Sequence, residues 1–316
     1  MAFFIVTPLA VVEGNSYIDF GYLGSRGLFV GMLVGIIATR IYAFFIEKKI
    51  TIKMPNTVPP IVSTSFSSLI PGVFIATFFV LINTLVGMTS FGNVHALIAA
   101  LIQQPLQSMG SNIVTVVILV AMMEFLWFFG IHGSNVINPI LLTVFYSMDL
   151  QNMEALSAGV AMTNVITVSF IQNWKGPRNL ALAILLTFKA KSQHLKSIGK
   201  LGIVPAFFGI SEPLKFGLPM ILNPIIGIPM VLTPVVSILL SYWATLAGII
   251  PIANGATIPS GTPELLRPLF ICGIRGVLFG LVLLVVCMII YYPFVMIFDK
   301  KKLEEEKALS EDLKEE

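Results

Sequence analysis

Long apolar runs dominate the pattern of hydrophobic and polar positions along the chain. Six stretches carry few or no charged residues: Gly27–Ile46, Gly72–Thr89, Ile113–Ile131, Ala155–Trp174, Leu201–Pro263 and Gly276–Phe298. An α-helix of about 20 residues crosses the roughly 30 Å hydrocarbon core of a bilayer, and each run approaches or exceeds that length. The pattern therefore predicts an all-α polytopic membrane protein.

Composition agrees with this prediction. Hydrophobic residues make up 56% of the 316 residues, charged residues only 11%, and the mean hydropathy is +0.93. So few charges cannot cover the surface of a soluble protein of this size. The basic residues lie beside apolar runs, as topology determinants do, so no nucleic-acid partner is expected. The two cysteines, Cys272 and Cys287, form no metal or disulfide pattern, and we expect no metal and no cofactor.

The basic clusters predict the orientation of the chain. They comprise Arg40 to Lys53, Lys175 to Lys200 and Lys300 to Lys302. By the positive-inside rule all three are cytoplasmic, so an even number of crossings separates the first two. A short crossing in Val94–Leu106 or Asn135–Met148, or a span that doubles back, would supply that number. Residues 1–298 are then the membrane domain, and residues 299–316 a charged cytoplasmic tail, either a solvated helix or disordered.

Prolines interrupt the longest apolar run near its start. They are Pro205, Pro213, Pro219, Pro224, Pro229 and Pro234. Because proline breaks or kinks a helix, and broken backbone at membrane depth survives only beside protein or water, Lys200–Pro224 is predicted to be a re-entrant element lining a polar cavity. Gly255–Pro268 is a second candidate of this kind.

Two ionisable residues lie where helices are disrupted. His132 stands between Gly130 and Gly133 in WFFGIHGSNVIN, and Glu212 precedes Pro213 in GISEPLKFGLP. Both are candidate site residues, since ionisable groups inside a membrane are costly. The alternatives are an interfacial histidine that faces water and an ion pair between Glu212 and Lys215.

Three other polar or aromatic residues rank lower as site candidates. Glu124 shares a helix face with Trp127, so it is either a cavity residue or a partner in a helix–helix hydrogen bond. His95 and Trp174 are expected at the membrane interface.

These segments resemble a known family. WFFGIHG, KSQHLKSIGKLGIVPAFFGISEPLKFGLPMILNP and KMPNTVPPIVSTSFSSLIPG are similar to motifs of the membrane subunit, enzyme IIC, of bacterial sugar phosphotransferase systems, in its lactose/cellobiose branch. The resemblance implies a permease for a β-disaccharide such as cellobiose, chitobiose or lactose, in the bacterial plasma membrane. It implies that His132 and Glu212 bind the sugar and orient or deprotonate its hydroxyl group. The full predicted substrate-binding set is Trp127, Gly130, His132, Gly133, Asn135 and Glu212.

The resemblance also implies partners. A sugar hydroxyl attacks the phosphocysteine of a soluble IIB protein. A IIA protein supplies the phosphoryl group to IIB, and this chain itself carries none. Four basic residues of the cytoplasmic side are expected to attract IIB: Lys175, Arg178, Lys189 and Lys191.

Three features depart from the family pattern. Family members carry about three more hydrophobic segments before Leu23, and a homodimer is expected if that part is supplied. The family's Asn-Ile-Asn-Glu-Pro reads Gly209 to Pro213 here, and NGATIPSGTP replaces a tryptophan–proline pattern.

Two other functions fit the residues themselves. One is an integral-membrane enzyme that uses His132 and Glu212 as an acid–base pair on a lipid-linked substrate. The other is a proton-coupled secondary transporter with Glu212 as its proton site.

Overall fold

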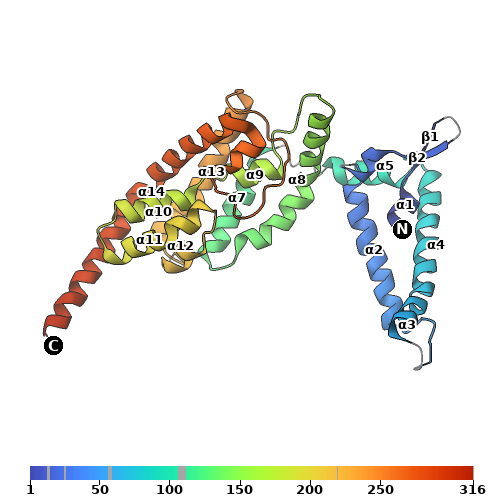
Figure 1. The fold of residues 1–316 in the computed structure, drawn as a ribbon, viewed down its shortest axis with the longest axis horizontal. Coiled ribbons are helices and arrows are strands. Elements are labelled where there is room, and N and C mark those ends of the chain that lie inside the picture. The colour runs from blue at the N-terminus through green and yellow to red at the C-terminus, as the bar shows by residue number, and fades with distance from the viewer. Residues whose placement is uncertain (13–14, 25, 56–58, 106–111, 219, 316) are drawn as a thin grey trace. The chain divides into compact units, whose positions relative to one another are not determined.

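The computed structural model describes residues 1–316 except 13–14, 25, 56–58, 106–111, 219 and 316. The chain divides into two compact units, Met1–Ser108 and Met109–Glu316 (Figure 1). Helices account for most of the described residues, which confirms the all-α prediction. One short hairpin is the exception within that part: β1 (Leu9–Val12) pairs antiparallel with β2 (Asn15–Ile18).

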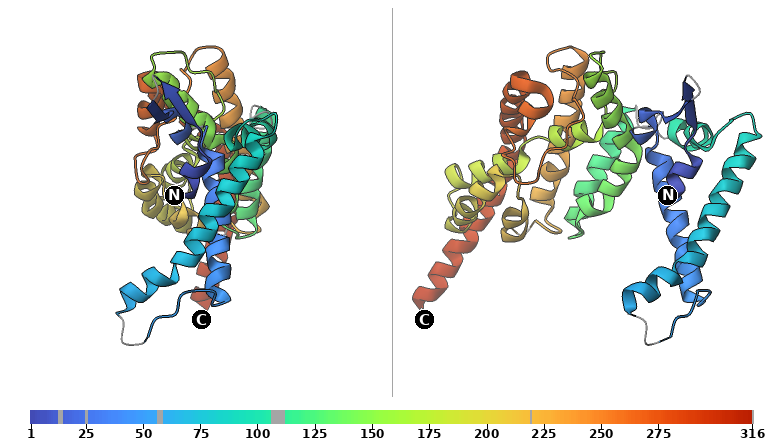
Figure 2. Two further views of the ribbon diagram at one scale, coloured as in Figure 1. Left: turned by 90° about the vertical axis from the view of Figure 1, so that its right-hand side faces the viewer. Right: turned by 45° about the vertical axis from the view of Figure 1, so that its right-hand side comes forward.

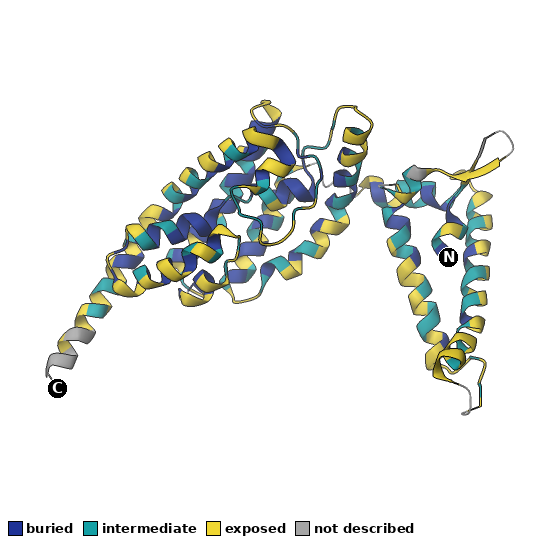
Figure 3. Ribbon diagram, viewed as in Figure 1, coloured by how far each residue is buried: buried dark blue, intermediate teal, exposed yellow. Residues whose placement is uncertain are grey.

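The first unit is built around two long helices. Its helical elements are α1 (Ala2–Val6), η1 (Phe20–Leu23), α2 (Leu28–Glu47), α3 (Pro60–Ser67), α4 (Leu69–Gly87), α5 (Val94–Ile98) and η2 (Ala99–Gln103). The long helices α2 and α4 run in opposite directions, and α1 packs against both (Figure 2). Many outward apolar side chains stay exposed, among them Ile36 on α2 and Val73 on α4 (Figure 3). Such surfaces suit a lipid environment.

The sequence predicted His95 at the membrane interface, but the structure places it inside the first unit. It is 3% exposed, its Nε2 lies 3.2 Å from the Thr7 hydroxyl, and its ring contacts Tyr22 and Phe3. The helix α1 covers it, a contact between distant segments that periodicity cannot indicate.

The second unit carries the remaining helices. They are α7 (Ile113–Phe128), α8 (Gly133–Ser157), α9 (Val168–Trp174), α10 (Arg178–Phe188), α11 (Gln193–Phe207), α12 (Glu212–Gly217), α13 (Pro224–Leu246) and α14 (Arg267–Glu315). Helix α13 packs against α7 and α14, and α8 packs against α7. The buried residues form two apolar clusters, one around Phe145 and Trp174 and one around Leu186 and Tyr291. Trp174 is 1% exposed, so the interfacial position expected for it is wrong.

The stretch Ala155–Trp174 is not a span, contrary to its apolar composition. Helix α8 ends at Ser157, Gly159 adopts a positive φ of 68°, and the chain continues without helix until α9 begins at Val168. The Thr167 side chain caps α9 by accepting a hydrogen bond from the Phe170 N–H. A left-handed glycine ends a helix whatever the hydropathy around it. Instead, α8 itself has 25 residues, about 37 Å at 1.5 Å per residue, and it contains the Asn135–Met148 segment considered for a short crossing.

The proline-rich region is broken as predicted. Helices α10 and α11 form a tight hairpin, and α12 is a single short helix after Gly209, which has a φ of 79°. The second candidate segment, before α14, is also largely non-helical. Among the described residues, four helical stretches are long and apolar enough to cross a membrane: Leu28–Glu47, Pro60–Gly87, Pro224–Leu246 and Arg267–Ala308.

The charged tail continues α14 and contacts the α10–α11 hairpin. The Asp299 carboxylate accepts hydrogen bonds from the Lys191 and Ser192 N–H groups. The Glu306 carboxylate accepts from the Ser192 hydroxyl and the His194 N–H. Because the first N–H groups of a helix have no partner within it, these carboxylates stabilise the start of α11.

Candidate functional site

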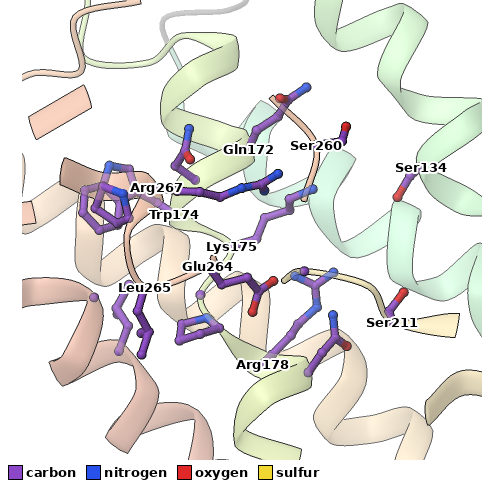
Figure 4. Close-up of a pocket in the computed structure, with 18 of the residues that line it drawn as sticks. Ser134, Gln172, Trp174, Lys175, Arg178, Ser211, Ser260, Glu264, Leu265 and Arg267 are labelled. Carbon is purple, nitrogen blue, oxygen red and sulfur yellow. The ribbon is translucent and has the colours of Figure 1, made fainter. Parts of the chain in front are cut away.

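A polar cavity of about 360 Å³ lies within the second unit (Figure 4). Its walls come from the α7–α8 junction, the α9–α10 junction, the start of α12 and the segment that leads into α14. Three of these walls are places where a helix is interrupted. Interrupted helices leave polar backbone and side chains facing a shared space, as in many transporter sites.

Two glycines shape the α7–α8 junction. Gly130 has a φ of 79°, which side-chain-bearing residues rarely adopt. A Cβ on Gly133 would lie 1.8 Å from the Met123 carbonyl oxygen, so only glycine allows α8 to start so close to α7. Both glycines were predicted to bind substrate, but neither lines the cavity. They act on the backbone and place His132 between them.

His132 is held at the cavity wall by its neighbours. Its Nδ1 accepts a hydrogen bond from the Asn135 N–H at 3.3 Å, and its ring centroid lies 4.4 Å from that of Trp127. A neutral imidazole that accepts at Nδ1 carries its proton on Nε2. The structure thus leaves the Nε2 proton free to face the cavity, which Trp127, His132 and Asn135 all line.

Glu212 lies opposite this nitrogen. It is the first residue of α12, and Pro213 takes the start of the helix, where its missing N–H costs nothing. Glu212 Oε1 lies 3.9 Å from His132 Nε2, and both side chains are a little under half exposed. That separation exceeds a direct hydrogen bond, but one hydroxyl group between them can bond to both. The two residues singled out from the sequence therefore meet.

Lys215 does not pair with Glu212, the alternative considered from the sequence. Its Nζ lies 3.7 Å from Glu124 Oε2 and 3.8 Å from the centroid of the Trp127 ring. Glu124 is fully buried and also accepts a hydrogen bond from the Arg178 guanidinium. It does not line the cavity, and its hydrogen bond from Arg178 of α10 confirms the helix–helix alternative considered from the sequence. One carboxylate of α7 joins α10 and α12 beneath the Trp127 ring.

The sequence misplaced the basic residues of the α9–α10 junction. Lys175 and Arg178 were expected on the cytoplasmic surface, but both line the cavity, and Arg178 is only 8% exposed. Arg267 and Glu264, which the sequence did not single out, line it too. Gly176 and Pro177 interrupt the helix between Lys175 and Arg178, which is the same signal that marked His132 and Glu212. Because Lys175 and Arg178 lie beside apolar runs, the sequence predicted them on the cytoplasmic surface instead.

Several buried polar atoms in the cavity lack a partner within the described part of the chain. They are Asn138 Oδ1, Trp174 Nε1, Glu264 Oε2 and Arg267 Nε. Buried polar groups are hydrogen-bonded in most structures, so four unpaired ones at a single cavity indicate a polar ligand. The described residues contain no group of three or more His, Cys, Asp or Glu side chains arranged to hold a metal ion.

Glu264 has a distinct electrostatic setting. It lies in the connection before α14, where its N–H donates to the Phe207 carbonyl oxygen. Loss of hydration raises the pKa of its carboxyl group, and the charges of Arg178 and Arg267 oppose that rise only in part. The neutral form of this carboxyl is thus favoured more than in water.

Comparison with known proteins identifies the family. The model of the family "Phosphotransferase system, EIIC" matches residues 1–234. The chain is 36% identical over 310 residues to the oligo-beta-mannoside-specific EIIC component of Bacillus subtilis (strain 168), covering 96% of this chain and 70% of that protein. It is 35% identical to the cellobiose-specific EIIC component of Geobacillus stearothermophilus, covering 97% of this chain and 72% of that protein.

A solved structure agrees. The transporter ChbC, the IIC component of the N,N'-diacetylchitobiose-specific phosphotransferase system, superposes with a TM-score of 0.90 at 37% identity, over 97% of this chain and 74% of ChbC. These relationships favour a phosphotransferase permease over an acid–base enzyme or a secondary transporter. The chain belongs to the EIIC family, the multi-pass membrane subunits through which phosphotransferase systems take up sugars.

Proposed function

We propose that the cavity of the second unit binds a β-linked disaccharide such as cellobiose, chitobiose or lactose. Two relatives are named for cellobiose and for N,N'-diacetylchitobiose, both β-linked. The observation that carries the proposal is the set of unpaired buried polar atoms around one cavity, Asn138 Oδ1, Trp174 Nε1 and Glu264 Oε2 among them. Sugar hydroxyl groups both donate and accept, so they can satisfy the Trp174 N–H group and the Asn138 and Glu264 oxygens together.

In this proposal His132 and Glu212 hold the hydroxyl group that is phosphorylated. The Glu212 carboxylate accepts the hydroxyl proton, and the His132 Nε2–H donates to the oxygen. Their 3.9 Å separation supports this arrangement, since one hydroxyl group beside both atoms completes both bonds. Trp127, fixed from behind by Lys215, offers an apolar ring face next to His132. Asn135 orients the histidine through its backbone N–H.

The proposed partners are a soluble IIB protein carrying a phosphocysteine and a IIA protein that recharges it. We propose that residues 1–298 form the membrane domain, that the tail 299–316 is cytoplasmic, and that the protein works as a homodimer. The basic residues Lys189 and Lys191, both exposed near the tip of the α10–α11 hairpin, support a cytoplasmic docking face for an acidic partner.

Sugar uptake into vesicles tests the proposed function. With IIA, IIB and the soluble carriers that pass the phosphoryl group from phosphoenolpyruvate to IIA supplied inside, phosphoenolpyruvate should drive accumulation of sugar phosphate, and cellobiose, chitobiose and lactose should compete with one another. Accumulation of unmodified sugar driven by a proton gradient would contradict group translocation. Failure of all three β-disaccharides to compete, with uptake of another sugar intact, would contradict the proposed substrate class alone.

A further inference from the structure

Four basic side chains line the cavity, and only two of them have an acidic partner among the described residues. Arg178 and Lys215 share Glu124, while Glu212 stands beside His132. Within the same described part, Lys175 and Arg267 have no carboxylate oxygen within 4.0 Å, and Arg267 Nε has no hydrogen-bond partner. The polar contact recorded for Lys175 Nζ is the Met123 sulfur at 3.8 Å, a weak acceptor.

The backbone directs both cations into the cavity. Gly176, with a φ of 76°, packs so closely on α13 that a Cβ there would lie 2.5 Å from the Ser237 hydroxyl oxygen. This contact fixes the turn that carries Lys175. Arg267 opens α14, where its N–H donates to the Pro263 carbonyl oxygen. Figure 4 shows the two side chains extending into the cavity from these separate segments.

A neutral sugar does not require two uncompensated cations. Removing a cation from water costs free energy unless an opposite charge or a set of strong acceptors replaces the lost hydration. The nearby Glu264 replaces it only in part, because burial favours its neutral form. A ligand that becomes anionic inside the cavity would complete the compensation. Group translocation creates such a ligand when the sugar is phosphorylated.

We propose that Lys175 and Arg267 bind the phosphoryl group during its transfer and in the sugar phosphate product. This inference rests on the proposed function. The sugar hydroxyl oxygen attacks the phosphorus atom of the IIB phosphocysteine, and the new O–P bond forms as the P–S bond breaks. The bonding pair leaves on the IIB thiolate, and the hydroxyl proton passes to Glu212. The ammonium and guanidinium groups stabilise the charge on the three remaining phosphoryl oxygens.

The test uses the purified full chain and two ligands, inorganic phosphate and cellobiose. Trp127 and Trp174 line the cavity, so tryptophan fluorescence reports occupancy by either ligand. Lys175→Gln and Arg267→Gln should each weaken phosphate binding about tenfold or more, while cellobiose affinity changes less than about threefold. Lys175→Arg and Arg267→Lys, which keep the charge, should retain most phosphate binding. Lys200→Gln and Arg275→Gln are matched controls, because they remove exposed charges from α11 and α14.

Turnover gives a second readout. In the coupled assay with IIB, Lys175→Gln and Arg267→Gln should lower kcat about 100-fold with little change in the KM for sugar, as loss of an electrostatic donor does elsewhere. Equal losses of phosphate and cellobiose affinity would make the two residues sugar ligands and overturn the proposal. So would phosphate binding that is absent from the unmodified chain or unchanged in the variants. Failure of the unmodified chain to bind any β-disaccharide, with phosphate binding still sensitive to both residues, would instead refute the proposed substrate.

Discussion

The imidazole of His132 and the carboxylate of Glu212 approach each other from segments that are 80 positions apart in the chain, each placed by a glycine with positive φ. Gly130 precedes the histidine and Gly209 precedes the glutamate. The side chains of His132 and Glu212 are neither buried nor fully exposed, so both remain available to a ligand. A pair of this kind binds a hydroxyl group better than either residue alone, because the oxygen receives a donor and the proton an acceptor.

Loss of either residue should weaken sugar binding. We expect Glu212→Gln and His132→Ala each to reduce affinity about tenfold or more, roughly 1.4 kcal/mol, because a buried sugar hydroxyl loses a charge-assisted or a donated bond. Phosphorylation should fall at least as far. Equilibrium binding to the purified protein measures the effect. Unchanged affinity in both variants would remove these residues from the site.

The carboxylate of Glu124 should matter for stability rather than for sugar contacts. Glu124→Gln leaves Arg178 and Lys215 without their shared anion, and removing one partner of a buried ion pair typically costs about 3–5 kcal/mol. We expect a marked drop in the thermal unfolding midpoint of the purified protein. Glu305→Gln, which removes an exposed charge of α14, is the control and should leave the unfolding midpoint nearly unchanged. Equal midpoints for the two variants would contradict the buried network.

The sequence predicted the site residues that lie near helix interruptions marked by glycine or proline. It did not predict the site residues whose role depends on contacts with distant segments. Trp127, His132, Asn135 and Glu212 were predicted, and all four line the cavity. Lys175 and Arg178 were assigned to the cytoplasmic surface because a basic residue beside an apolar run has the same local pattern whether it faces water or a buried glutamate. The partner of Arg178 lies 54 positions earlier, and only the packing of α7 against later helices brings them together.

At the scale of the helices, the start of α8 depends on the absence of one side chain. Gly133→Ala places a Cβ 1.8 Å from the Met123 carbonyl oxygen, so the helix start and the adjacent His132 must shift. We expect sugar affinity to fall about tenfold, since a displacement of a catalytic or binding group by about 1 Å can cost that much or more. Gly72→Ala in α4 meets no atom within 4 Å and should leave affinity unchanged. Binding titration compares the two variants. Equal affinities would mean that this junction yields without moving His132.

The contact between the tail and the α10–α11 hairpin gives another prediction. Glu306→Ala removes the acceptor of the Ser192 hydroxyl and of the Gln193 and His194 N–H groups. Amide hydrogen exchange at the start of α11 should therefore become faster, while exchange in α13 stays unchanged. Glu304→Ala, an exposed neighbour on the same helix, serves as the matched control. Unchanged protection in Glu306→Ala would show that α11 does not depend on the tail.

Helix boundaries were predicted best where apolar composition and helix length coincide. The runs that became α2, α4 and α7 agree with the structure to within a few residues, and the run ending at Phe298 lies within α14. Ala155–Trp174 failed because hydropathy averages over a window and cannot register one left-handed glycine inside it. The tail was left open between a helix and disorder, and the structure gives a helix to Glu315.

At the scale of the second unit, contacts place two groups of segments at opposite ends of α14. The Asn152 side chain donates to the Ala253 carbonyl oxygen, and the Asn254 N–H donates to Ile271 near the start of α14. The hairpin residues Lys191 and Ser192 contact Asp299. After a kink at Gly273, the helix from Ile274 to Asp299 spans roughly 38 Å, more than a hydrocarbon core.

That arrangement allows the proposed orientation to be tested. If the hairpin and tail are cytoplasmic, an impermeant thiol reagent added to intact cells should label Ser157→Cys, which is exposed near the end of α8. The same reagent should not reach Ser197→Cys, which is exposed on α11. Both native cysteines are buried, so background labelling should be low. Labelling of the Ser197→Cys variant alone would reverse the orientation.

The carboxylate of Glu124 is synthesised before either of its charge partners. During translation, α7 with Glu124 emerges from the ribosome 54 positions before Arg178, and Lys215 emerges later still. An apolar helix that carries an unpaired carboxylate is a poor membrane segment on its own, because a charge in hydrocarbon is costly. The Glu124 carboxylate is therefore paired only once α10 has been made and supplies the Arg178 guanidinium. The buried ion pairs of this unit are therefore completed only after α7, α10 and α12 have all been made.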